Sequence, residues 1–183
     1  MHKFPAILAV ICLGACQAAV HLPVKGTVYL PGTQGYQDAF SASWNSRAST
    51  RKPAMFVYVT DESDIITCIN YGIQNGLKIT VRGGGHSLRS TVDGAMVIDT
   101  SNINHIEIDD DNQTVRLGAG CEIGAVYSAL QEKGLGIPAG TNGDVGIVGL
   151  SLLGGQGYLT RKYGLLVDNV VSYRMVTLAG SVC

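Results

Sequence analysis

A chain of 183 residues, 46% of them hydrophobic and 15% charged, is long enough to bury one core and does not have a disordered composition. Its 13 basic and 14 acidic residues give a formal net charge of -1 with no run of like charges, so neither nucleic acid nor an anionic membrane surface is an expected partner. The 24 glycines favour loops that approach a ligand closely.

Residues 1–19 combine a basic start, a short apolar run and small residues at a cleavage point, which predicts a secretory signal peptide. The run is short for a membrane span, and Pro23 and Gly26 follow it in place of a charge cluster. We therefore expect a secreted, extracellular protein without membrane contact once the signal is removed. A bacterial lipoprotein cleavage box at 13–16, which would tether the mature chain through Cys16, is the alternative.

Signal removal leaves three cysteines, Cys68, Cys121 and Cys183. The first two fall in predicted helices, where buried free thiols are favoured over a Cys68–Cys121 disulfide. Asn112 begins an N-glycosylation sequon in a polar turn, which agrees with secretion.

A strand–helix–strand unit is expected after an N-terminal segment (20–51) that covers the edge of the domain, with Tyr36 and Trp44 as bulky anchors. Residues 54–59 form a β-like run, and isoleucines recur at helical spacing from Ile65 to Ile73. Residues 77–81 read as the second strand.

Three glycines and a histidine follow this second strand in the stretch Arg82-Gly83-Gly84-Gly85-His86-Ser87. Consecutive glycines leave backbone N–H groups free to surround an anion such as a pyrophosphate, and an imidazole beside it can act as nucleophile, base or ligand. Leu88 stands where a dinucleotide fingerprint needs its last glycine, so this is not a Rossmann turn. The alternative is a flexible turn with an exposed histidine.

Further along the chain, residues 95–99, 104–108 and 114–120 read as three strands of a meander, and residues 122–133 as an amphipathic helix. The stretch 140–157 is rich in glycines that would weaken a helix, which indicates either close contact with a ligand or a glycine-rich packing segment. No hydrolase G-x-S-x-G or P-loop motif occurs, and His105 has no partners at metal-ligand spacing.

The glycine loop resembles that of the FAD-binding domain in the vanillyl-alcohol oxidase superfamily, and within it the berberine-bridge-enzyme-like FAD oxidases. A second group of matches follows in the family's order, at 137–140, 145–149, 153–157 and 161–170. The resemblance runs from about Lys52 to Gly180. It implies an α+β fold, a PCMH-type FAD-binding domain over 52–183 made of two packed α/β subdomains, with the substrate domain missing.

The resemblance also implies a set of cofactor-binding residues. The R-x-G-G-H-S loop of the family holds the FAD pyrophosphate, and its histidine is bonded to the 8α-methyl of the flavin, a role that falls here on His86. Some relatives have a second link through a cysteine, but Asn142 occupies that position, so a single covalent link is expected. The set implied for this chain is Arg82, Gly83, Gly84, Gly85, His86, Ser87, Gly140, Asn142, Gly143, Val145, Gly146, Gly149, Gly154, Gly155, Gly157, Tyr163, Asp168 and Asn169.

The function implied is oxidation of an alcohol, sugar or secondary metabolite by hydride transfer to FAD, with O₂ as acceptor and no metal. Residues 171–180 resemble the strand that precedes the substrate domain, and the catalytic base is expected beyond it, so no catalytic residue can be named. Two alternatives stay open: a truncated, inactive or unstable flavin-binding fragment, and a secreted binding protein that shares only the fold.

Overall fold

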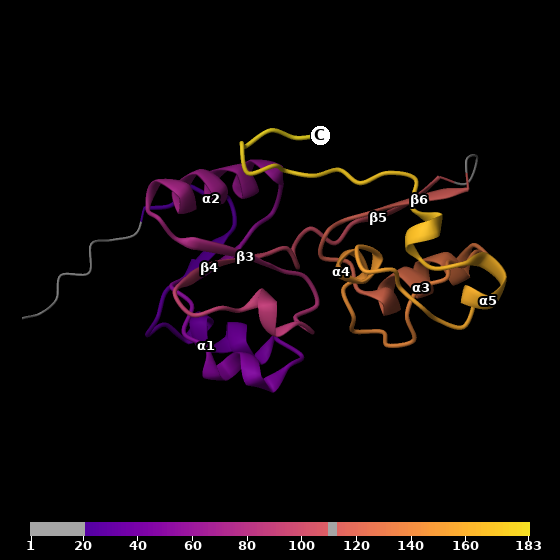
Figure 1. Cartoon of the computed structure of the whole chain (residues 1–183), viewed down its shortest axis with the longest axis horizontal. Helices are drawn as coiled ribbons and strands as arrows, with labels where there is room; N and C mark the ends of the chain where they lie inside the picture. Colours follow the sequence, from indigo (N-terminus) through magenta and orange to yellow (C-terminus); the bar gives the residue numbers. More distant parts are fainter. Residues whose placement is uncertain (1–20, 110–112) are drawn as a thin grey trace, which may run out of the picture.

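The computed structural model describes residues 21–109 and 113–183 as two α/β subdomains packed side by side (Figure 1). The predicted signal peptide and Asn112 lie outside these described residues. In the described part of the chain, no helix is both long and apolar enough to cross a membrane.

The first subdomain is built on a four-stranded sheet in the order β1 (Thr27–Tyr29), β2 (Met55–Tyr58), β4 (Ala95–Asp99), β3 (Lys78–Arg82). β4 pairs in parallel with both β2 and β3, while β1 lies antiparallel at the edge. Every residue of β4 is buried, as expected for a central parallel strand covered on both faces. The strand–helix–strand prediction is therefore confirmed.

Two helices cover the two faces of this sheet (Figure 1). Because side chains alternate along a strand, Met55 and Val57 face α2 (Glu62–Gln74), while Phe56 faces α1 (Gln34–Ser41). Tyr36 on α1 is buried against Phe56, as expected of an anchor. Trp44, in contrast, is 59% exposed, so it does not anchor the N-terminal segment by burial.

A buried carboxylate fixes the N-terminal segment to the start of α2. Asp64 accepts hydrogen bonds from the backbone N–H groups of Lys25 (2.7 Å), Gly26 (3.1 Å) and Thr60 (3.0 Å), and from the Thr60 hydroxyl (2.9 Å). Burial alone would raise the pKa of the Asp64 carboxyl, but these hydrogen bonds outweigh it and hold the pKa below its ordinary value. The ionised carboxylate thus stabilises the fold.

Asp64→Asn is expected to lower the free energy of unfolding by about 1–3 kcal/mol at pH 7, because the amide nitrogen would face backbone donors. The folded-state pKa of Asp64 lies below the unfolded value of about 3.9. The stability that the ionised carboxylate contributes is therefore complete above about pH 3.9 and is lost as the pH falls through the folded-state pKa. The difference between wild type and variant should therefore shrink below about pH 4. Urea unfolding at pH 7 and pH 3 measures it, with exposed Asp38→Asn as the control; a difference independent of pH would contradict the assignment.

The second subdomain packs a hairpin of β5 (Ile106–Asp109) and β6 (Thr114–Leu117) against α3 (Ile123–Glu132). The short helices α4 (Ile147–Ser151) and α5 (Thr160–Tyr163) follow. Three 3₁₀ turns complete the elements: η1 (Ser46–Thr50), η2 (Leu88–Ser90) and η3 (Val167–Asn169). The predicted three-strand meander is wrong, because β4 pairs with the strands of the first sheet and leaves β5 and β6 as a separate pair.

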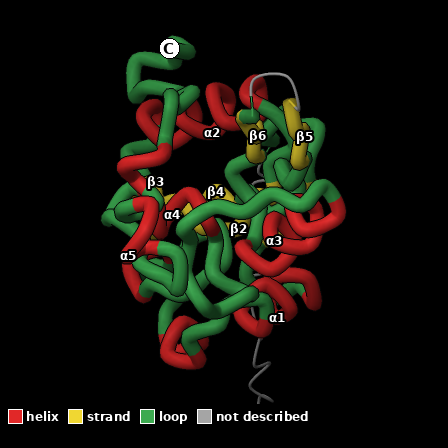
Figure 2. Tube along the Cα trace, turned by 90° about the vertical axis from the view of Figure 1, so that its right-hand side faces the viewer, coloured by secondary structure: helices red, strands yellow, loops and turns green. Residues whose placement is uncertain are grey.

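Residues 171–180 do not form the expected strand. They run back over α2, near the C-terminus in Figures 1 and 2, where Val176 packs on the core and Arg174 forms a two-point ion pair with Glu62. The segment then turns at Gly180 (φ +74°) and pairs with itself through a Val176–Val182 bridge. From Met175 to Cys183 the backbone groups pair with one another and not with a neighbouring sheet edge, so no ladder forms.

Cys68 and Cys121 are buried free thiols, as the helical positions predict, and Cys183 is free and exposed. Burial raises the pKa of Cys68 to about 12 and also raises that of Cys121, whose thiol donates to the His105 carbonyl. Both thiols therefore stay protonated at neutral pH and are poor nucleophiles.

Candidate functional site

The glycine loop leaves the carboxyl end of β3 and is shaped by close backbone contacts. A Cβ on Gly84 would lie 2.5 Å from the Gly146 nitrogen and 2.8 Å from the Asp144 carbonyl oxygen. Gly85 has φ +70°, and a Cβ there would lie 3.0 Å from the Cα of Ser43. Glycine is thus required at Gly84 for space, and at Gly85 for both space and backbone conformation.

The second glycine motif meets the first at this point. Residues 143–147 are held to the start of α3 by backbone hydrogen bonds, among them Ile123 N–H to Val145 O (3.0 Å) and Gly124 N–H to Gly143 O (2.8 Å). A Cβ on Gly146 would lie 2.7 Å from the Gly84 nitrogen. The structure therefore brings together the two motifs that the sequence analysis found about 60 residues apart, backbone against backbone.

Thr100, just after β4, ties the two subdomains together beside the loop. Its hydroxyl lies 3.1 Å from the Arg82 carbonyl in the first subdomain and 3.2 Å from the Ala119 carbonyl in the second. Gly120 packs on the Thr100 backbone so closely that a Cβ would lie 2.1 Å from the Thr100 carbonyl oxygen. The glycine loop thus lies along the seam between the subdomains.

Backbone donors of the loop are free to bind an anion. Among the described residues, none accepts a hydrogen bond from the N–H groups of Gly84, Gly85 or His86. Unpaired N–H groups in succession on a glycine-rich turn form a concave anion site. This donor set fits a pyrophosphate.

The Arg82 side chain has a different role from the one implied by the resemblance. It is 1% exposed, and its guanidinium forms an ion pair with Asp99 and donates to the Ser43 hydroxyl (2.9 Å) and the Tyr58 hydroxyl (2.7 Å). It also donates to the Ala39 carbonyl (2.5 Å). Because these partners surround it inside the protein, the guanidinium cannot reach a pyrophosphate at the surface, and it braces the base of the loop.

His86 lies at the rim of the loop, held from two directions. Its Nε2 is 3.2 Å from the Asp144 carbonyl oxygen and 3.5 Å from a carboxylate oxygen of the same residue. The Trp44 indole is stacked on the imidazole, with ring centroids 4.6 Å apart and planes 11° apart. Neither Trp44 nor Asp144 was among the predicted site residues, although Asp144 adjoins predicted positions.

The other predicted residues are divided between the seam and the second subdomain. Ser87 caps η2 by accepting from Arg89 N–H (3.2 Å), while Asn142 is exposed in the loop before Gly143. Gly157 packs on Ala139, where a Cβ would lie 1.7 Å from the carbonyl oxygen. Further glycines of the predicted set lie in the same subdomain, packed around α4 or open at its surface: Gly140, Gly149, Gly154 and Gly155.

Tyr163, Asp168 and Asn169 form a turn of their own. Asp168 accepts from Leu165 N–H (2.8 Å), and the Asn169 amide donates to the Tyr163 and Leu165 carbonyls (2.9 and 2.8 Å). These side chains thus order the connection between α5 and η3.

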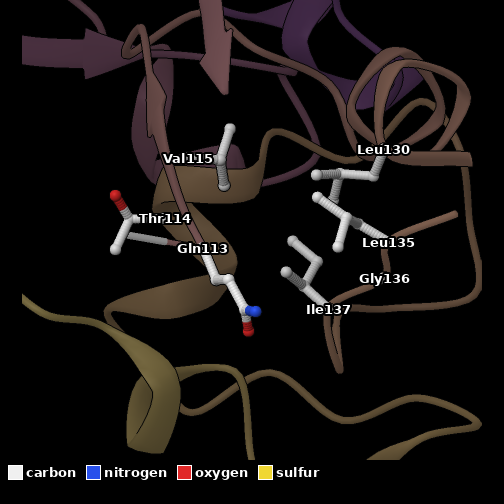
Figure 3. A pocket seen from close by; sticks show the side chains of 7 residues that line it. All are labelled: Gln113, Thr114, Val115, Leu130, Leu135, Gly136 and Ile137. Carbon is white, nitrogen blue, oxygen red and sulfur yellow. The ribbon is translucent and has the colours of Figure 1, made fainter. Parts of the chain in front are cut away.

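Two cavities lie in or beside the second subdomain. One of about 150 Å³ opens between β6 and the end of α3, with apolar side chains such as Leu130 and Ile137 around it and no predicted site residue (Figure 3). The other, of about 300 Å³, flanks the seam and is lined by Ser101, Asn104, Gly120, Cys121, Glu122 and Ala125. Neither cavity is lined by a residue of the glycine loop.

Two α/β subdomains meet at a glycine loop whose unpaired N–H groups could hold the pyrophosphate of a flavin dinucleotide. The family model described as "FAD binding domain" matches residues 53–183, and the chain belongs to this family. The family and its fold were thus predicted correctly from the sequence.

Two relatives show how much of each chain the sequence match covers. The chain is 35% identical to (R)-6-hydroxynicotine oxidase of Paenarthrobacter nicotinovorans over 90% of its own length and 36% of the relative. It is 31% identical to berberine bridge enzyme-like 8 of Arabidopsis thaliana over 87% of its length and 33% of the relative. Other relatives are named FAD-linked oxidoreductases. The chain thus spans about a third of the length of these relatives.

Two solved structures also match the fold of this chain. The crystal structure of 6-hydroxy-D-nicotine oxidase from Arthrobacter nicotinovorans matches with a TM-score of 0.86 and 34% identity, over 91% of this chain and 37% of that one. The wild-type BBE-like 1 of Physcomitrella patens matches with a TM-score of 0.80 and 34% identity, over 86% and 35%. Both share the two-subdomain fold described here.

Proposed function

We propose that this protein is an FAD-linked oxidoreductase in which the loop Gly83–Ser87 binds the FAD pyrophosphate and His86 carries the flavin through a single covalent bond. One observation supports the proposal above all: Gly84 and Gly146 pack backbone to backbone, which places unpaired loop donors and His86 together at the seam. Asn142 stands where a second link would need a cysteine.

The geometry at His86 also indicates which ring nitrogen would react. Nε2 faces the carbonyl and carboxylate oxygens of Asp144, which favours the tautomer protonated at Nε2. Nδ1 then keeps its lone pair and is the nucleophile. Nδ1 of His86 would hold the flavin at its 8α-carbon. Forming this bond would release one proton from the imidazole and one from the methyl group, and O₂ would be the oxidant that takes up the two electrons as H₂O₂.

The whole protein would oxidise a small molecule, as the names of its oxidase relatives suggest, with O₂ as the acceptor. When bound, the flavin supplies hydride acceptance, and the residues of this chain supply orientation and nearby dipoles. Glycines of the second motif would lie along the cofactor. We further propose that the protein is exported, because residues 1–19 have the pattern of a signal peptide.

His86→Ala is expected to abolish acid-stable flavin while leaving dissociable FAD, because the variant removes the nucleophile but not the backbone donors of the loop. The measurement is an absorbance spectrum and intact mass of the purified chain before and after acid precipitation. His21→Ala is the matched control, since this histidine is exposed and precedes β1 in the chain. Covalent FAD in His86→Ala, or its absence from the wild type, would contradict the proposal.

A further inference from the structure

The exposed stack of Trp44 on His86 has no place in the function proposed so far. Trp44 is the only tryptophan of the chain and is 59% exposed, so it contributes little to the core. One face of its indole nevertheless lies parallel to the imidazole, with centroids 4.6 Å apart. We propose that Trp44 is a positioning residue that orients the His86 ring for flavin attachment, an inference that rests on the proposed covalent bond at His86.

The backbone around Trp44 is fixed to the glycine loop at several points. Asn45 N–H approaches the Gly85 carbonyl oxygen at 3.5 Å, and the left-handed Gly85 lets the loop pass against Ser43. The buried guanidinium of Arg82 donates to the Ser43 hydroxyl at 2.9 Å. The segment that places the indole against His86 is thus fixed to the glycine loop by these contacts.

Two contacts of different kinds restrict the imidazole. The indole face limits rotation of the ring out of its plane, and the Asp144 carbonyl oxygen holds Nε2 at 3.2 Å. A histidine without such neighbours would populate several χ1 and χ2 rotamers. A preset ring places Nδ1 in one direction, and misplacing a reacting atom by about 1 Å can cost about 100-fold in rate.

The test compares Trp44→Leu, which removes the aromatic face, with Trp44→Phe, which keeps one. FAD is added to the apo form of the full chain, and acid-stable flavin is followed over time by mass. Trp44→Leu should attach FAD about tenfold or more slowly, while dissociable FAD binding stays close to wild type. Trp44→Phe should recover most of the rate. Tyr173→Leu, at an exposed aromatic of the segment that runs over α2, is the control and should match the wild type.

A second readout needs no cofactor. Stacking on an indole shifts the carbon-bound imidazole protons of His86 upfield in the NMR spectrum of the apo chain, and Trp44→Leu should remove this shift. Wild-type attachment rates in Trp44→Leu, or imidazole signals that the substitution leaves unmoved, would overturn the positioning role. A wild-type chain that never acquires acid-stable flavin would instead contradict the proposed function, and the imidazole signals would then decide alone whether Trp44 orients His86.

Discussion

Gly84→Ala is expected to weaken FAD binding by about 5- to 140-fold, because overpacking costs about 1–3 kcal/mol and each 1.4 kcal/mol is a factor of ten. The new Cβ would lie 2.5 Å from the Gly146 nitrogen and 2.8 Å from the Asp144 carbonyl oxygen. Both are backbone atoms, so neither can rotate out of the way. The loops must move apart, which displaces the anion-binding donors and separates His86 from Asp144.

Titration of the chain with FAD, followed by quenching of the fluorescence of its only tryptophan, measures this effect. Gly136→Ala is the matched control, because a Cβ there meets only Leu159 Cδ1 at an ordinary 3.6 Å. Unfolding in urea shows how much of the effect is global stability. Wild-type affinity in Gly84→Ala would show that contact between the two glycine motifs is not needed for cofactor binding.

Arg82→Met is expected to lower the free energy of unfolding by about 3–5 kcal/mol, because it leaves the carboxylate of Asp99 buried without its partner. Arg82 and Asp99 are 1% and 2% exposed, so water cannot replace the lost interaction. The substitution also removes the donors to Ser43 and Tyr58. Since Arg82 braces the segment that carries Trp44, the loop should lose order as well.

Urea or thermal unfolding measures this loss, and the exposed ion pair of Arg116 with Glu107 provides the control. Arg116→Met should cost at most about 1 kcal/mol, as is usual for surface pairs. Arg82→Lys should fall in between, because lysine keeps the charge but not the planar set of five donors. A cost below about 1 kcal/mol for Arg82→Met would show that Arg82 does not support the seam.

Local patterns in the sequence were enough for part of the first subdomain but not for β1 and α1. Helical spacing of isoleucines predicted α2, and compact β-like runs predicted β2 and β3, because each pattern reports which side chains one core will bury. The glycine loop was correctly placed after β3 because three consecutive glycines weaken a strand and favour a turn.

Predictions that depended on pairing between distant segments were less successful. The sequence predicts β4 as the first strand of a meander, but in the structure β4 pairs with β2 on one side and with β3 on the other. Residues 171–180 have strand-like composition, yet they turn back on themselves at Gly180. Sequence composition reports burial and extension, whereas the choice of partner depends on which edges the rest of the fold leaves open.

The sequence by itself determined the FAD-binding family, the two glycine motifs and His86 as the candidate for flavin attachment, because these depend on residue type and order along the chain. Only the tertiary structure decided that Gly84 lies on Gly146, that the Arg82 guanidinium is buried and that Trp44 and Asp144 hold the imidazole. The physical reason is distance along the chain. These contacts join residues between 17 and 62 positions apart, and no local propensity encodes a contact that exists only once separate segments of the chain have packed together.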